Sequence, residues 1–397
     1  MEDKEDNRIP GLSNLEEDNW KDVRESVKIL CGNFSGEYWR KLDNKREYPK
    51  EFVEALTKAG YLACLIPEKY GGSGLPLQAA CAILEEIQRS GGNGAACHAQ
   101  MYIMGALLRH GSEKQKNEFL PKIASGELRL QAFGVTEPDA GTDTLSIKTK
   151  AEKKENYYVI NGQKVWTSRA EYSDLMLLLA RTSTKSEDKR TGGLSLFLID
   201  MRKAKGKGLN IKPIRTMINH ATTEIFFDNL EIPHNSLIGE EGKGFKYILD
   251  GMNAERILIA AECIGDAKFF IDKSTLYAKN RKVFGRPIGQ NQGVQFPISR
   301  AYADTEAAAL MVQKAAKLFD NNISCGSEAN IAKLLAADAS WKAGESAMQT
   351  FGGYGFAEEY DIERKFRETR LYQIAPVSTN LILAYIAQNI LGLKRSY

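Results

Sequence analysis

The sequence is poor in the residues that usually build metal sites and disulfides. Its 397 residues include only four histidines, at positions 98, 110, 220 and 234, and six cysteines. There is no HExxH spacing, no CxxC pair and no Cys/His cluster, so a metal site is not expected. We interpret the cysteines as reduced thiols that mostly fill the core of a protein in a reducing compartment.

Long apolar runs and an excess of charge are also missing. The apolar stretches in YLACLIP and DLMLLLA are far shorter than the ~20 residues that cross a bilayer. The 54 basic and 51 acidic residues leave a net charge of +3, which disfavours nucleic acid as the main partner. The first twenty residues are acidic and lack an apolar core, so neither a signal peptide nor a transit peptide is expected. We therefore predict a cytoplasmic protein.

The hydrophobic pattern changes twice along the chain. Apolar residues recur every three or four positions in the first zone, which predicts helices. Short β-rich runs follow, and Asn161-Gly162 between YYVI and QKVW predicts a β-hairpin that ends at Trp166. Four long helical segments then predict an antiparallel bundle. The predicted fold class is multi-domain α and β, with an N-terminal all-α domain (1–130), a small β-barrel or sandwich domain (131–240) and a C-terminal four-helix bundle (241–397).

Two kinds of feature carry little functional information. The glycine groups GGSG, GGNG and FGGYG do not lie between a predicted strand and a helix, which argues against a Rossmann or P-loop site. His98 lies in the apolar run GAACHAQMYIMG, and Cys263 lies in an apolar helix. We interpret His98 as a core or pocket-wall residue and Cys263 as inert packing.

Two segments around the β zone suit a planar heterocycle such as a flavin. QAFGVTEPDAGTDT supplies hydroxyls and accessible backbone N–H groups at Thr136, Gly141 and Thr142, although an ordinary Asp-Gly turn has the same pattern. In KVWTSRA, Trp166 can stack on an aromatic ring beside the hydroxyls of Thr167 and Ser168. A lone tryptophan at a strand end is more often a core residue, so this segment alone decides nothing.

Two segments in the C-terminal zone suit a dinucleotide. In RKVFGRPIGQNQG, Arg281 is a fixed cation suited to a pyrophosphate, and Phe284, Gln290 and Gln292 add an aromatic face and amides. QTFGGYGF allows its backbone to approach a bulky group closely. Each signal is weak alone, and together they favour a bound flavin cofactor.

Six motifs occur in the order and spacing of one family. IPEKYGGSGL, VTEPDAGTD, the Trp166 segment, RKVFGRPIGQNQ, QTFGGYGF and RETRLYQI make the chain resemble the acyl-CoA dehydrogenases from about residue 45 to the C-terminus. The resemblance implies an FAD-dependent enzyme of fatty acid β-oxidation that converts an acyl-CoA thioester to trans-2-enoyl-CoA. It also implies a homotetramer built as a dimer of dimers, with an electron-transfer flavoprotein as electron acceptor.

The resemblance also implies cofactor-binding residues. Those around the isoalloxazine are Phe133, Val135, Thr136, Thr142, Trp166, Thr167 and Ser168. Those that hold the ADP half across a subunit interface are Arg281, Phe284, Gln292, Gln349, Gly352 and Gly353. Gly141 and Asn380 complete the cofactor-binding set.

The catalytic base departs from the commonest family pattern. Most members carry a glutamate in YQIYEGT, where this chain reads YQIAPVSTN and has Pro376. Proline accepts no proton and has no N–H to bind a thioester oxygen. Either the chain is catalytically defective, or its base lies elsewhere in the sequence.

Glu255 is the candidate for a base elsewhere. DGMNAERILIA resembles the helix that carries the base in long-chain and isovaleryl-type members, although a surface Glu-Arg pair has the same pattern. We predict that Glu255 removes the α-proton while hydride passes to flavin N5. Arg256 is expected to order the pocket wall and, with Asn253 and Thr142, to contact the substrate.

Alternative functions share the same scaffold. An acyl-CoA oxidase usually carries a further C-terminal helical domain, which is not expected in a chain that ends at Tyr397. A flavin monooxygenase tends to lack both the VTEP context and a glutamate beside Arg256. Pro376 favours a third alternative, a catalytically impaired flavin-binding homologue.

Overall fold

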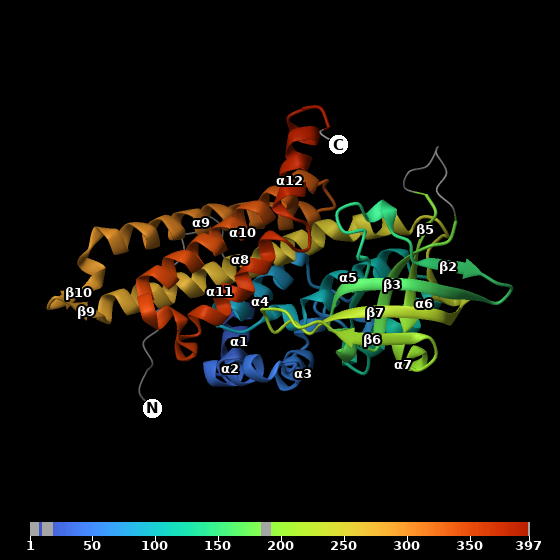
Figure 1. Ribbon diagram of the computed structural model, residues 1–397, viewed down its shortest axis with the longest axis horizontal. Coiled ribbons are helices and arrows are strands. Elements are labelled where there is room, and N and C mark those ends of the chain that lie inside the picture. Colours follow the sequence, from blue (N-terminus) through green and yellow to red (C-terminus); the bar gives the residue numbers. More distant parts are fainter. Residues whose placement is uncertain (1–7, 10–18, 184–191, 396–397) are drawn as a thin grey trace. The chain divides into compact units, whose positions relative to one another are not determined.

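The computed structural model describes residues 8–9, 19–183 and 192–395 (Figure 1). Contacts divide the chain into two compact units. We call Met1–Asn44, Leu77–Gly94 and Asn253–Tyr397 the helical unit. We call Lys45–Pro76 and Ala95–Met252 the sheet unit. All six cysteines are buried, and no helix in the described residues is both long and apolar enough to cross a membrane.

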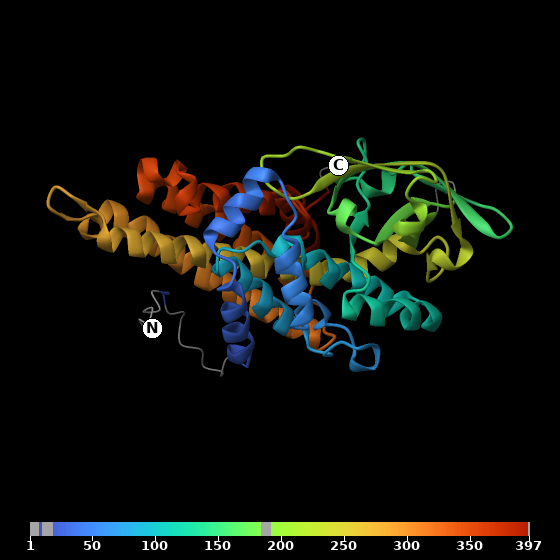
Figure 2. The ribbon, with the colours of Figure 1, turned by 90° about the horizontal axis from the view of Figure 1, so that it is seen from below.

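The helical unit contains most of the long helices. Its elements are α1 (Lys21–Cys31), α2 (Gly36–Lys45), α4 (Leu77–Arg89), α8 (Gly244–Asn280), β9 (Lys282–Val283), β10 (Arg286–Pro287), α9 (Gln292–Asp320), α10 (Gly326–Phe351), α11 (Ile362–Arg370) and α12 (Thr379–Tyr385). Helix α8 begins in the sheet unit and continues into this one. Helices α9 and α10 run side by side, in orange in Figures 1 and 2.

The four helical segments predicted for the C-terminal zone are confirmed as α8, α9, α10 and α12. Buried alanines on α10, including Ala336, Ala343 and Ala347, allow neighbouring helices to approach closely. Helix α11 was not predicted. Its sequence, IERKFRETR, has only Ile362 and Phe366 as apolar residues, because most of the residues that it buries are charged or polar.

The charged face of α11 belongs to a buried polar network. Lys365 Nζ lies 2.5 Å from Asp266 Oδ1 of α8 and 3.0 Å from Glu368 Oε2. The same ammonium donates to Gln88 Oε1 of α4 at 2.6 Å. Burial raises the pKa of Asp266 to about 7, although the Lys365 ammonium opposes this rise. The native helical unit therefore holds a proton on Asp266 at mildly acidic pH.

The sheet unit places three helices beside one sheet. The helices are α3 (Lys50–Lys58), α5 (His98–His110) and α6 (Glu113–Ser125), with the short α7 (Met201–Ala204) after the fifth strand. The strands are β1 (Leu130–Gly134), β2 (Lys150–Lys153), β3 (Tyr157–Ser168), β4 (Leu175–Arg181), β5 (Leu194–Asp200), β6 (Leu209–Pro213), β7 (Thr222–Pro233) and β8 (Leu237–Ile238). Their order is β6-β7-β3-β2-β4-β5-β8, and β1 pairs in parallel with β4.

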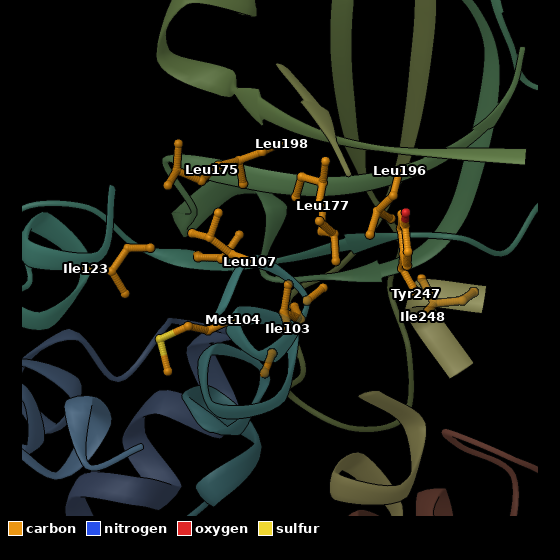
Figure 3. Packing of buried hydrophobic residues seen from close by; sticks show 14 of the residues in the cluster. Ile103, Met104, Leu107, Ile123, Leu175, Leu177, Leu196, Leu198, Tyr247 and Ile248 are labelled. Carbon is orange, nitrogen blue, oxygen red and sulfur yellow. The ribbon is translucent and has the colours of Figure 1, made fainter. Parts of the chain in front are cut away.

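One core of the sheet unit joins the helices to the sheet. Ile103 and Leu107 of α5 pack with Ile123 of α6 against Leu177 of β4 and Leu196 of β5 (Figure 3). Strands β4 and β5 are apolar at nearly every position because both of their faces are buried. This packing fixes β1, and with it the segment that follows β1, against the helices.

The predicted Asn161-Gly162 hairpin is wrong. Strand β3 runs unbroken through both residues and pairs with β7, with a register shift between Ile160 and Gly162. Gly162 has φ +145°, and a Cβ there would lie 2.6 Å from Thr149 Oγ1. Asn-Gly therefore marks a bulge, for which positive φ is as useful as for a turn. The hairpin lies instead between β2 and β3.

Replacing Asp266 by Asn is expected to remove a pH dependence of stability. The raised pKa means that the contribution of Asp266 is present at low pH and is lost as pH rises through about 7. Between pH 5 and pH 8 the wild type should lose about 2–3 kcal/mol from this group. Urea midpoints at the two pH values measure this loss, which should be absent in Asp266→Asn.

The control for this experiment is Asp272→Asn. Asp272 is also on α8 and pairs with Arg89 at 2.9 Å. This variant should keep the pH 5 to pH 8 loss of the wild type. An equal loss of stability in Asp266→Asn and the wild type would show that the pH dependence does not come from a proton bound to Asp266.

Candidate functional site

A buried ion pair fixes the VTEPDAGTD segment on the sheet. Glu137 Oε1 lies 2.9 Å from Lys164 Nζ of β3, and the same ammonium donates to Val135 O at 2.9 Å. The Glu137 carboxylate also accepts the backbone N–H groups of Lys148, at 2.5 Å, and Thr149, at 2.9 Å. The segment after β1 is thus held to β3 and to the start of β2.

Each charge of this ion pair stabilises the charged form of the other residue. Burial lowers the pKa of Lys164 to about 8, and Glu137 opposes that shift. Burial acts to raise the pKa of Glu137, yet the Lys164 ammonium and the N–H of Lys148 hold it below its ordinary value. The sequence analysis missed both residues. The glutamate of VTEP was visible, but a lysine in a strand gives no sign that it is buried.

The residues predicted around an isoalloxazine gather on β1, β3 and the segment after β1. Val165 N donates to Thr136 O at 2.9 Å, which joins the two stretches. Phe133 and Val135 are partly buried against the core shown in Figure 3. Thr142 is exposed, and Ser168 is half-buried at the end of β3.

Three observations fit a flat polar ligand at this edge. Trp166 is 59% exposed at φ +60°, so its indole is not a core side chain. Thr167 Oγ1 is buried with no hydrogen-bond partner among the described residues. A Cβ on Gly141 would meet nothing within 4 Å. An exposed aromatic face, an unpartnered hydroxyl and an open backbone together suit a heterocycle with donors and acceptors.

Glu255 lies on the helical unit and is buried. Only 7% of it is exposed, which excludes the surface Glu-Arg pair. The neighbouring Arg256 donates through Nη1 to Asn253 Oδ1 at 2.9 Å. Burial lowers the pKa of Arg256, and Glu255 opposes that shift. The predicted base and its two predicted neighbours therefore lie on one stretch of α8.

The segment with Pro376 is fixed by a buried lysine. Lys333 Nζ of α10 donates to the carbonyl oxygens of Tyr372 and, at 2.8 Å, of Val377. Burial lowers the pKa of Lys333 to about 8, and Cys263, Asp338 and Glu255 oppose the shift. Sequence analysis gave no sign of this lysine, because one lysine in an alanine-rich helix resembles an ordinary solvated residue.

The residues predicted to bind the ADP half lie around the far end of α8. Arg281 follows α8 and lies over the Tyr354 ring at 5.6 Å. Phe284 is fully exposed at φ +53° in the β9–β10 turn, and a Cβ on Gly353 would meet nothing within 4 Å. Gln292, Gln349 and Gly352 are also exposed. Asn380, the remaining predicted cofactor residue, is exposed on α12 and does not belong to this group. Twenty-five helical residues at 1.5 Å each place Asn280 about 38 Å along α8 from Glu255.

One buried cluster was only partly foreseen. Arg169 Nη1 lies 3.3 Å from His220 Nε2, and Nη2 lies 3.5 Å from His98 Nε2. Burial, Arg169 and His98 hold the pKa of His220 well below its ordinary value. Sequence analysis placed His98 in a core or pocket wall without its partners. Within the described part of the chain, no group of three or more His, Cys, Asp or Glu residues is arranged to hold a metal ion.

Family models match all three zones of the chain. They are the N-terminal domain of acyl-CoA dehydrogenase over residues 17–127, the middle domain over 132–230 and the C-terminal domain over 242–391. An acyl-CoA dehydrogenase of Mycobacterium bovis is 33% identical over 390 residues, which cover 96% of this chain and 98% of that protein. The chain belongs to the acyl-CoA dehydrogenase family, which confirms the resemblance in the sequence.

Solved structures agree with this assignment. A glutaryl-coenzyme A dehydrogenase in complex with glutaryl-CoA has a TM-score of 0.89 and 30% identity, and the match covers 97% of this chain and 98% of that chain. An FAD complex of PigA has a TM-score of 0.87 and 25% identity, over 96% of this chain and 99% of that chain. The expected helical, β-sheet and helical order of three domains is confirmed.

Replacing Glu137 by Gln should destabilise the sheet unit and weaken flavin binding. Lys164 would keep a buried charge with its carboxylate partner removed, a change that costs about 3 kcal/mol. Urea unfolding of the flavin-free protein and titration of that protein with FAD measure the two effects. The control is Asp139→Asn, which removes the exposed pair between Asp139 and Lys148 and should change stability by less than about 1 kcal/mol. Equal stability of the two variants would contradict this account.

Proposed function

We propose that the protein catalyses FAD-dependent α,β-dehydrogenation of an acyl-CoA thioester to trans-2-enoyl-CoA, with Glu255 as the base. The observation that supports this proposal most is the burial of Glu255 on α8, in a chain whose tail carries Pro376 in place of the usual glutamate. A carboxylate shielded from water can take an α-proton without competition from bulk solvent. Arg256 and Asn253, which hydrogen-bond to each other, are positioned to order the substrate beside Glu255.

FAD supplies the hydride acceptor of this reaction when it is bound. Trp166, Thr167 and Ser168 at the end of β3 would hold its ring system, together with Thr136, Gly141 and Thr142 after β1. The unpartnered Thr167 hydroxyl and the exposed Trp166 indole support this assignment. Phe133 and Val135 would keep water from that edge of the sheet, because they continue its apolar core.

We propose that a second copy of the chain binds the ADP half. Arg281 follows Asn280, which lies about 38 Å along α8 from Glu255. The exposed Phe284 and the open Gly353 support an interface there. Each site would thus combine Glu255 of one copy with Arg281, Phe284, Gln292, Gln349, Gly352 and Gly353 of another, and Asn380 would also contact the cofactor.

Several finer features are proposed from the family. They are a homotetramer built as a dimer of dimers, electron transfer to an electron-transfer flavoprotein, a role in fatty acid β-oxidation and a cytoplasmic location. The domain boundaries proposed are 1–130, 131–240 and 241–397. Pro376 supports one competing function, a flavin-binding homologue that has lost catalysis, because it removes both an N–H donor and the usual carboxylate.

Replacing Glu255 by Gln should strongly slow the reduction of the flavin by acyl-CoA. The purified flavoprotein is mixed anaerobically with saturated acyl-CoAs of increasing length and with a branched one, and the flavin absorbance is followed. Wild type should bleach with at least one of them, and Glu255→Gln should react about 10²–10⁴-fold more slowly, since the base is removed. Rapid reoxidation in air during turnover would indicate an oxidase.

The matched control is Glu262→Gln. Glu262 is a second buried glutamate on α8 and pairs with Tyr372 at 3.1 Å. This variant should keep the bleaching reaction. No bleaching of the wild type with any acyl-CoA would exclude the enzyme, whereas full activity of Glu255→Gln would exclude only the assignment of the base.

Mixing two defective chains tests whether two copies share one site. Glu255→Gln and Arg281→Ala are co-expressed with different affinity tags, and mixed dimers are purified through both tags. In a site that combines Glu255 and Arg281 from different copies, one of the two sites of each mixed dimer is intact. About half of wild-type activity is expected. Activity no higher than that of the two parents would place both residues in one chain's site.

A further inference from the structure

The end of strand β3 has an uncommon backbone conformation. Trp166 and Arg169 each have φ +60°, and Ala221, just before β7, has φ +46°. The pairing of β3 with β7 shifts its register between Lys164 and Thr167, so Trp166 lies in a bulge. A left-handed conformation costs free energy in a residue that has a Cβ. It persists only where the surrounding contacts impose it.

Hydrogen bonds of the main chain impose part of this conformation. Arg169 N donates to Ala221 O at 2.7 Å, and Tyr172 N donates to Arg169 O at 3.1 Å. Thr223 Oγ1 donates to Thr167 O at 2.6 Å. These bonds join the end of β3 to the start of β7. We call residues 166–169 and 220–223 the β3 corner.

The side chain of Arg169 connects the β3 corner to helix α5. Arg169 is only 3% exposed. Its Nη1 lies 3.3 Å from Nε2 of His220, and its Nη2 lies 3.5 Å from Nε2 of His98 on α5. A guanidinium has donors and no acceptor, so each Nε2 that faces it offers a lone pair. Both imidazoles are therefore neutral, with the proton on Nδ1.

His98 extends this connection to strand β1. Its ring centroid lies 5.6 Å from that of Tyr102, and the Tyr102 centroid lies 6.5 Å from that of Phe133 on β1. All of these residues belong to the sheet unit. Arg169 is thus linked to both groups of residues that are proposed to hold the isoalloxazine, by the chain itself to Trp166 and through two rings to Phe133.

We propose that Arg169 is a positioning residue for the flavin ring. Its guanidinium, held by His98 and His220, fixes the end of β3. Trp166 then presents its exposed indole to the ring. Thr167 presents a buried hydroxyl that has no hydrogen-bond partner in the described part of the chain. Groups that bind a ligand keep their geometry only where residues behind them hold them. This inference rests on the proposed function, because it assumes that the flavin ring lies at these residues.

The affinity for FAD tests the role of the guanidinium. Flavin-free protein is titrated with FAD, and the flavin fluorescence gives the dissociation constant. Arg169→Met should bind FAD about tenfold more weakly than the wild type, a change equivalent to the loss of one hydrogen bond. The matched control is Arg129→Met, because Arg129 is another arginine of the sheet unit and donates through Nη1 to Thr57 Oγ1 at 2.6 Å. This control should bind FAD as tightly as the wild type does.

Two variants of His220 distinguish hydrogen bonding from packing. His220→Gln keeps an acceptor oxygen for the Arg169 guanidinium, whereas His220→Leu fills a similar volume and offers no acceptor. The Gln variant should bind FAD nearly as tightly as the wild type, and the Leu variant should bind it more weakly. If the imidazole merely fills space, the two variants should have equal affinity.

Two further readouts use the flavin-free protein. Nitrogen NMR resolves the four histidines of the chain. In the wild type, His98 and His220 should carry the proton on Nδ1, and Arg169→Met should weaken this preference. Amide hydrogen exchange of the β3 corner should be faster in Arg169→Met than in Arg129→Met. If Arg169→Met does not fold, Arg169→Asn removes the guanidinium and tolerates the positive φ.

The outcomes separate this inference from the proposed function. The role of Arg169 would be overturned by wild-type affinity for FAD in Arg169→Met, by equal affinity of the two His220 variants, or by equal exchange of the β3 corner in the two arginine variants. A wild type that binds no FAD would overturn the proposed function and, with it, any role of Arg169 toward the flavin. The measurements on flavin-free protein would still show whether Arg169 fixes the β3 corner.

Discussion

Charge buried along helix α8 constrains the rest of the helical unit. A carboxylate cannot stay in a low-dielectric core without a partner, and α8 buries three of them on one face. Lys365 of α11 pairs with Asp266, and Tyr372, before α12, donates to Glu262, so these acids restrict how the two segments can pack against α8. Apolar packing among Phe270, Ala343 and Ile362 supplies attraction, but it tolerates sliding far better than paired charges do.

The pairing of buried charges also explains which helices the apolar sequence pattern predicts and which it misses. Helices α4, α5, α8, α9 and α10 follow from apolar periodicity, because they bury apolar faces. Helix α11 buries Arg364, Lys365 and Glu368, and its sequence therefore resembles a solvated segment. Lys164 and Lys333 escape prediction for a related reason: their carboxylate or carbonyl partners are far away in sequence, so nothing local marks them as buried.

An Asn-Gly sequence also fails to distinguish a β-turn from a β-bulge. Asn161-Gly162 has the composition of a two-residue hairpin, yet β3 continues through it because Gly162 approaches Thr149 too closely for any side chain. Sequence reasoning identified the candidate flavin residues through motif resemblance, and the structure adds their physical support in the anchored VTEP segment and the unpartnered Thr167 hydroxyl. Positive φ is a local property, whereas the choice between a turn and a bulge depends on the partner strand.

Pro376 and Lys333 together determine how the tail segment is held. Proline removes an N–H from the tail, so that residue can be held only through its side chain or through carbonyl oxygens nearby. Lys333 donates to two such oxygens, on either side of the proline. The two residues are compatible in one segment, because the Lys333 ammonium supplies hydrogen-bond donors where the proline supplies none.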